Sequence, residues 1–183
     1  MNYHDIKYDN MLNGQGLRAV LFVSGCNHNC EGCHNPETHD PNSGLPFTDN
    51  ELNEILEYLE NDYVSGLTLS GGDPLYYKNR LEIKRIIKAV RDKFGYSKNI
   101  WLYTGYTFNE LKDAIDTISM VDVLVDGKYI KSQACGEDYP WVGSFNQRLI
   151  DIKKTLEIKS IVLYEDTFTK FAGIIPDQLF NIQ

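Results

Sequence analysis

Three cysteines lie close together in the sequence, in the pattern C-x-x-x-C-x-x-C. Cys26, Cys30 and Cys33 directly follow the apolar run 19–23. Cysteine thiolates are the usual ligands of iron-sulfur clusters, and an ordinary 4Fe-4S cluster takes four of them. Because no fourth cysteine lies nearby, the spacing predicts a metal centre with one iron left open. An open iron indicates chemistry on a bound molecule rather than electron storage alone.

Other uses of this cluster are weaker. Zinc would take the three cysteines together with a histidine such as His34, in a closed tetrahedral site. Structural zinc ligands commonly come as two short pairs, however, and this spacing is different. An electron-transfer ferredoxin would need a fourth cysteine in register. Cys135 is remote in the sequence and is expected to be a plain free thiol, and His28 is expected to be a solvated loop histidine.

Composition limits the fold and the partners. A chain of 183 residues, 42% of them hydrophobic, can bury one substantial core, so a single domain over residues 1–183 is expected. The net charge of −8 disfavours a nucleic-acid partner. No run approaches the ~20 apolar residues of a membrane span, and the N-terminus has no apolar signal core. We therefore expect a cytoplasmic protein with reduced thiols and no membrane partner.

The apolar pattern alternates between short runs and longer helical segments, which predicts parallel strands joined by helices. Strands are expected at 18–23, 66–69, 100–103 and 121–125, and extended structure at 153–163. Helices are expected after the capping boxes 48–51 and 107–110 and over 83–94. Since a complete eight-unit barrel needs ~250 residues, the fold class is α/β with an open sheet or a partial barrel.

Each predicted strand ends in glycine beside a polar or ligating residue. The segments are 24–26, 70–73, 104–105 and 126–128. Ligands gather at the carboxyl ends of parallel strands, so these four segments are expected to meet at one site. Taken alone, Gly71 to Pro74 would serve as a plain turn, and Asp126 with Lys128 as a surface charge pair. Their coincidence with the cysteine cluster favours a functional role.

The cysteine spacing after a first strand resembles the signature of the radical S-adenosylmethionine (SAM) enzymes. The chain is most similar to the activating enzymes of anaerobic ribonucleotide reductases, which belong to the glycyl-radical activating enzymes. The resemblance runs from the N-terminus to about Ile150. It is carried by segments 13–16, 22–26, 30–35, 69–75, 101–106, 123–128 and 143–147.

The resemblance implies a partial (β/α)6-type barrel of parallel strands, the radical SAM core, at about 14–150, followed by a C-terminal extension at 151–183. It also implies that the three cysteines hold a 4Fe-4S cluster, whose fourth iron binds the amino and carboxylate groups of SAM. The implied contacts to this cofactor come from Gly32, Cys33, His34, Gly72, Asp73, Asp126 and Lys128. Segment 143–148 is left without a role.

The implied activity is the formation of a glycyl radical on the large subunit of an anaerobic ribonucleoside-triphosphate reductase, by reductive cleavage of SAM. The implied partners are that subunit and an electron donor such as a flavodoxin, with a homodimer or a heterotetramer as the assembly. The alternatives are an activator of a different glycyl-radical enzyme, a deazapurine synthase, or a zinc-stabilised binding module.

Overall fold

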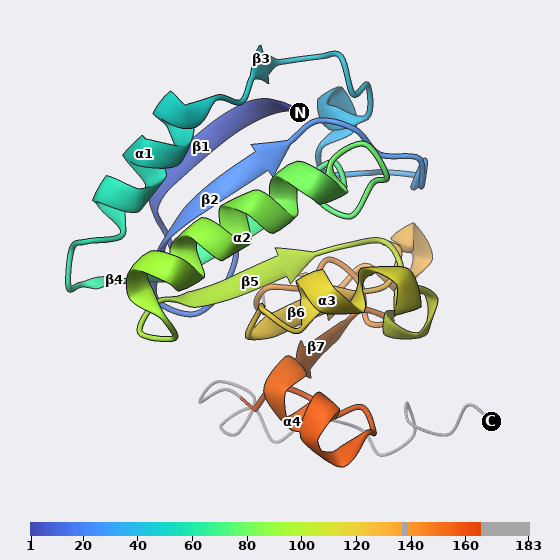
Figure 1. The fold of residues 1–183 in the computed structure, drawn as a ribbon. Helices are drawn as coiled ribbons and strands as arrows, with labels where there is room; N and C mark the ends of the chain where they lie inside the picture. Colours follow the sequence, from blue (N-terminus) through green and yellow to red (C-terminus); the bar gives the residue numbers. More distant parts are fainter. Residues whose placement is uncertain (137–138, 166–183) are drawn as a thin grey trace.

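The structure, a computed structural model, describes residues 1–136 and 139–165, and a mixed β-sheet of seven strands forms the centre of this part (Figure 1). The strands are β1 (Asn2–Asn10), β2 (Leu17–Val23), β3 (Leu45–Pro46), β4 (Val64–Gly71), β5 (Asn99–Tyr103), β6 (Val123–Asp126) and β7 (Arg148–Asp151). They lie in the order β3-β1-β2-β4-β5-β6-β7. Since β3 and β7 form its two edges, the described sheet is open.

The four central strands β2, β4, β5 and β6 are parallel, as the apolar runs predict. Leu21 lies beside Leu69 in the register of β2 and β4, and Leu102 beside Leu124 in that of β5 and β6. All four side chains are fully buried. Strands covered on both faces have nearly continuous apolar sequences, which is why these were recognisable.

The edges of the sheet differ from the expected barrel. Within the described residues, only the four strands at the centre of the sheet are parallel to one another. Strand β1 runs antiparallel to β2, β7 runs antiparallel to β6, and β3 runs antiparallel to β1. Most residues of β1 are polar and at least partly exposed. Such a strand carries no clear alternation of buried and exposed positions, so the sequence did not reveal it.

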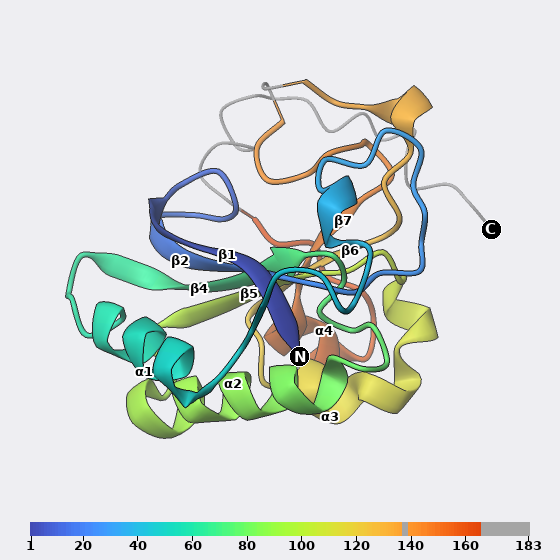
Figure 2. The same cartoon turned by 90° about the horizontal axis from the view of Figure 1, so that it is seen from above.

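Helices α1 (Asp49–Tyr58) and α2 (Arg80–Phe94) cover one face of the sheet (Figure 2). Both were predicted. The capping box of α1 is present, because Glu51 accepts the N–H of Thr48 at 2.6 Å and Thr48 Oγ1 accepts that of Asn50 at 3.2 Å. Helix α2 buries four side chains against the sheet, those of Ile83, Ile86, Ile87 and Val90.

The predicted helix after the second capping box is broken into short pieces. Glu110 accepts the N–H of Thr107 at 2.7 Å, as expected, but the box precedes a 3-10 turn, Phe108–Glu110. A second turn, Lys112–Ala114, and the four-residue helix α3 (Ile115–Ile118) follow. The apolar residues Leu111, Ala114 and Ile118 are still buried. Their spacing correctly predicted that these side chains are buried. Short helical pieces are enough to bury them, so a continuous helix is not required.

The prediction of extended structure at 153–163 is wrong for its first half. Helix α4 (Ile152–Ile158) begins directly after β7, and Asp151 caps it by accepting the N–H of Lys154 at 3.0 Å. The side chains buried by α4 are Ile152 and Thr155, which are three residues apart, as on one face of a helix. None of the helices in the described part combines the length and apolar character of a membrane span.

A smaller apolar cluster covers the face of the sheet opposite α1 and α2. It contains Trp101, Val123 and Val125, whereas Leu102 and Leu124 belong to the main core. Successive residues of a strand point to opposite faces, so the same two strands support both clusters. Partly buried aromatic residues, Trp141 among them, complete the smaller cluster.

Candidate iron-sulfur site

The loop after β2 carries the three cysteines, all of them partly buried. Its first residues are held by backbone hydrogen bonds, from the N–H of Gly25 to the carbonyl of Thr38 at 2.7 Å and from that of Cys26 to His39 at 3.1 Å. Gly25 has a φ of 104°, and a Cβ there would lie 2.8 Å from the ring of Tyr76. Glycine therefore permits the turn that brings Cys26 over the strand end.

The three cysteines line one cavity of about 340 Å³. Other parts of its wall come from the ends of the parallel strands, with Gly71 at the end of β4, Gly72 after it, Gly105 after β5 and Gly127 after β6. These glycines are far apart in the sequence, but their strands are neighbours in the sheet. The four strand ends therefore meet at one place, as expected for a parallel sheet.

Five of the residues predicted for the site line this cavity: Cys26, Cys30, Cys33, His34 and Gly72. The ring of His34 packs against that of Tyr129, with 4.8 Å between centroids. The other four predicted residues, Gly32, Asp73, Asp126 and Lys128, lie outside the described lining. Gly32 has a φ of 70° and faces the side chain of Lys131, 3.2 Å from the Cβ that it lacks. Contact of these residues with a cofactor stays a prediction.

Asp126 is buried and is bound to residues other than Lys128. Its carboxylate accepts hydrogen bonds from Arg148 Nε at 2.9 Å and from the N–H of Phe108 at 2.7 Å. It thereby joins the end of β6 to the edge strand β7 and to the 3-10 turn after β5. Lys128 is exposed, and its positive charge acts to lower the pKa of Cys30.

Asp73 and His28 form a pair at the cavity, where His28 belongs to the described lining beside the cysteines and Asp73 does not. The carboxylate of Asp73 is fully buried, and its Oδ2 lies 2.7 Å from His28 Nε2. The side chain of His28 is 13% exposed, and its ring contacts that of Tyr106 edge-on at 4.5 Å between centroids. The expectation of a solvated loop histidine is therefore wrong. A local sequence pattern cannot reveal a partner that lies 45 residues away.

Segment 143–147, which had no role from the sequence, borders the cavity. Gly143 and Gln147 both belong to its lining. Gln147 Oε1 accepts the N–H of Gly143 at 2.9 Å, and Nε2 donates to the carbonyl of Gly127 at 2.9 Å. The glutamine side chain therefore holds two sides of the cavity together. Asn35, which was also missed, lines the cavity and donates to the carbonyl of Gly71 at 3.3 Å.

Burial keeps two thiols of the site protonated before any metal is bound. It raises the pKa of Cys26 to about 11 and also raises that of Cys30, where the positive charge of Lys128 acts in the opposite direction. Both thiols are therefore protonated at neutral pH. Since a metal binds the thiolate, loading a cluster must release these protons.

The arrangement fits an iron-sulfur cluster better than a single metal ion. Within residues 1–136 and 139–165, no three His, Cys, Asp or Glu side chains converge closely enough to hold one ion. A tetrahedral zinc site at these cysteines is thus not preformed. A 4Fe-4S cluster allows its ligands to lie further apart, because each thiolate binds a different iron. Three cysteine thiols around one cavity suit that requirement.

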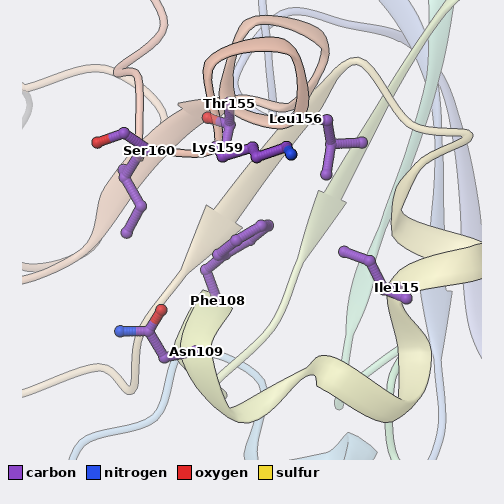
Figure 3. A pocket seen from close by; sticks show the side chains of 8 residues that line it. Phe108, Asn109, Ile115, Thr155, Leu156, Lys159 and Ser160 are labelled. Carbon is purple, nitrogen blue, oxygen red and sulfur yellow. The ribbon is translucent and has the colours of Figure 1, made fainter.

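A second cavity of about 350 Å³ lies between the turns after β5 and helix α4 (Figure 3). Phe108, Ile115 and Leu156 supply its apolar wall, and Lys159 lies on the same side as α4. It contains none of the predicted site residues and no cysteine among its described lining. The chemistry therefore belongs to the first cavity.

Comparison with known proteins identifies the class first. Residues 12–150 match the family described as a 4Fe-4S single cluster domain. This match covers more than half of the chain and contains all three clustered cysteines. The chain is thus an iron-sulfur protein of the single-cluster class.

More specific relatives carry one shared name, anaerobic ribonucleoside-triphosphate reductase-activating protein. The protein of Enterobacteria phage T4 is 46% identical over 149 residues, which cover 81% of this chain and 93% of that protein. Those of Vibrio cholerae and Escherichia coli K12 are 41% and 39% identical over 150 residues, which cover 80% of this chain and 96% of each relative. The chain belongs to this family of reductase-activating proteins.

Proposed function

We propose that this chain generates a glycyl radical on the large subunit of an anaerobic ribonucleoside-triphosphate reductase. The observation that carries the proposal is the meeting of three cysteines and three strand-end glycine segments around one cavity, in a chain of this family. A reduced 4Fe-4S cluster held by these cysteines would supply one electron to break the sulfur–adenosyl bond of SAM, which would release methionine and give a 5′-deoxyadenosyl radical able to take a hydrogen atom from the glycine.

The residues of the chain bind and position the reactants. Cys26, Cys30 and Cys33 would hold three irons and leave the fourth for the amino and carboxylate groups of SAM. Gly72 supports this role, because a Cβ there would lie only 2.7 Å from the carbonyl of Gly25. The chain at this point is packed against the cysteine loop, and a side chain would separate the two. Contacts to SAM from Gly32, His34, Asp73, Asp126 and Lys128 are part of the proposal.

The proposal extends to the fold and the partners. The four parallel strands, with the cysteines at their carboxyl ends, support a radical SAM core at about 14–150, within a single domain of residues 1–183. The electron would come from a reduced redox protein such as a flavodoxin, in the cytoplasm. Assembly as a homodimer, or as a heterotetramer with the reductase, would bring the cavity to the partner's glycine.

Electron paramagnetic resonance (EPR) of the large subunit tests this function. A glycyl doublet should appear only when the reconstituted chain, SAM and a strong reductant are all present. Replacing any one of Cys26, Cys30 or Cys33 by Ala should abolish SAM cleavage. Cys135→Ala is the matched control, because this thiol lies outside the described lining and donates to the carbonyl of Val142 at 3.3 Å.

Two results would contradict the proposal. One is a colourless protein with stoichiometric zinc after anaerobic reconstitution with iron and sulfide. The other is SAM cleavage that survives Cys30→Ala, which would mean that the cluster ligands are misassigned.

A further inference from the structure

His28 fastens the cysteine loop to the sheet. It lies in the loop between Cys26 and Cys30, yet its imidazole points to the end of β4, where Nε2 lies 2.7 Å from the carboxylate of Asp73. An ionised carboxylate can only accept hydrogen bonds, so Nε2 carries the hydrogen of this bond. The loop that holds two of the three thiols is therefore bound to the sheet by a side chain between them.

Asp73 in turn connects two strand ends. Its carboxylate accepts the hydroxyl of Thr104 at 3.0 Å and the N–H of Gly105 at 3.0 Å, both directly after β5. It also accepts the N–H of Leu75 in its own turn at 2.7 Å. A buried carboxylate must have such partners, because an unpaired charge in the interior is very costly. Together with His28, these donors surround both carboxylate oxygens.

Gly105 provides the space for the imidazole. A Cβ at this position would lie 2.4 Å from Cδ2 and 2.6 Å from Nε2 of His28. Any side chain at position 105 would therefore displace the ring. This observation is independent of the hydrogen bonds, and it indicates that the end of β5 is shaped around the histidine.

We propose that His28 and Asp73 are a positioning pair, which fixes the loop between Cys26 and Cys30 against the ends of β4 and β5 and so sets the position and surroundings of the cluster. The inference rests on the proposed function only in that a 4Fe-4S cluster occupies the three cysteines. Asp73 then serves the site by holding His28, in addition to the contact with SAM that is proposed for it. Groups behind metal ligands control how tightly a metal centre is held and tune its reduction potential.

The test compares cluster retention in His28→Phe and His28→Gln, after anaerobic reconstitution of each full chain. In His28→Phe we expect cluster iron to be lost to a chelator about 10- to 100-fold faster, the size of effect that removing a group which orients metal ligands usually has on metal binding. The EPR signal of the reduced cluster should change as well. His28→Gln can still present an N–H to Asp73 and should recover most of the retention.

His4→Phe is the matched control for the loss of a histidine. Its Nε2 makes a hydrogen bond of similar length, 2.8 Å to Ser43 Oγ, and His4 lies outside the described lining of the cavity. Retention and EPR signal should match the wild type. If His28→Phe also matches the wild type in both, while its apo form unfolds at the wild-type temperature, the positioning pair is overturned.

Gly105→Ala keeps the inference testable if His28→Phe does not fold. It keeps both His28 and Asp73 in the sequence but displaces the imidazole, so faster iron loss is expected here too, and wild-type retention would overturn the pair. A wild-type chain that takes up no cluster would overturn the proposed function and the pair with it. A wild type that cleaves SAM, beside variants with unchanged retention, would overturn the pair alone.

Discussion

Three charged side chains, those of Asp73, Asp126 and Arg18, are almost fully buried, and each is compensated differently. Asp73 is bound by His28 and Asp126 by Arg148, so each carboxylate has a cationic or polar donor from another element. Arg18 instead donates to side-chain and backbone oxygens of β4 and β5, and burial lowers its pKa to about 10. Because a buried charge left alone is costly, these contacts hold particular strands together.

Tyr58 gives a residue-scale prediction for the dependence of stability on pH. Burial and a 2.8 Å hydrogen bond to Asp9 raise the pKa of Tyr58 to about 12, above the ordinary value of about 10. The folded state therefore holds this proton more tightly than the unfolded state. The stabilisation is complete below about pH 10 and is lost as the pH rises toward 12.

Urea unfolding of the wild type and Tyr58→Phe, from about pH 8 to about pH 11, measures this effect. The stability difference between the two should shrink as the pH rises. Tyr63→Phe provides the matched control, because it removes the same hydroxyl from a side chain that is 60% exposed. A difference for Tyr58→Phe that stays constant or grows with pH would contradict the prediction.

At the scale of elements, the sequence predicted the centre of the sheet but not its edges. Strands β2, β4, β5 and β6 are covered on both faces, so each has an apolar run that can be recognised. The antiparallel strands β1 and β7 depend on pairing with a neighbour that a local pattern does not identify. The same limit applies to segment 143–147, whose role comes from its contact with the end of β6.

Gln147 should affect SAM binding more than cluster binding. Its amide makes hydrogen bonds to Gly143, Ser144 and Gly127. Each such bond contributes about 1 kcal/mol, and about 1.4 kcal/mol is a tenfold change in affinity. In Gln147→Ala we therefore expect SAM to bind about tenfold more weakly, measured by equilibrium binding, with unchanged iron content.

Gln133→Ala is the control for this substitution, because Gln133 is exposed and lies outside the described lining. Gln147→Glu keeps the acceptor for Gly143 but loses the donor to Gly127, so an intermediate affinity is expected. Wild-type affinity in Gln147→Ala would show that the segment does not shape the SAM site.

For the whole molecule, local sequence patterns identified most of the parts but not their contacts. The three cysteines and Gly72 were recognisable because each belongs to a short local motif. The fold brings these two motifs to the same cavity. The bonds of His28 to Asp73 and of Arg148 to Asp126 join residues 45 and 22 positions apart, so only the fold reveals them. Whether the chain is a single domain, as predicted, likewise depends on whether the two faces of the sheet unfold as one cooperative unit.

We predict that the two faces unfold together. The main core lies under α1 and α2, whereas Trp101 belongs to the cluster on the other face, and Trp101 and Leu102 are adjacent on β5. Loss of packing on one face should therefore expose the other. Far-UV circular dichroism follows the helices and tryptophan fluorescence follows Trp101 and Trp141, so in the apo protein both should give the same thermal midpoint.

Ile87→Val tests this coupling from the helical face. Ile87 is fully buried on α2, so the loss of one methyl group should cost about 1 kcal/mol and lower both midpoints equally, by about 2–4 °C. Leu81→Ala, on the same helix but 85% exposed, should change neither midpoint appreciably. If Ile87→Val shifted the circular dichroism midpoint while the fluorescence midpoint stayed at the wild-type value, the two faces would unfold separately. The chain would then contain more than one cooperative unit, because packing on α2 would stabilise only the face that it covers.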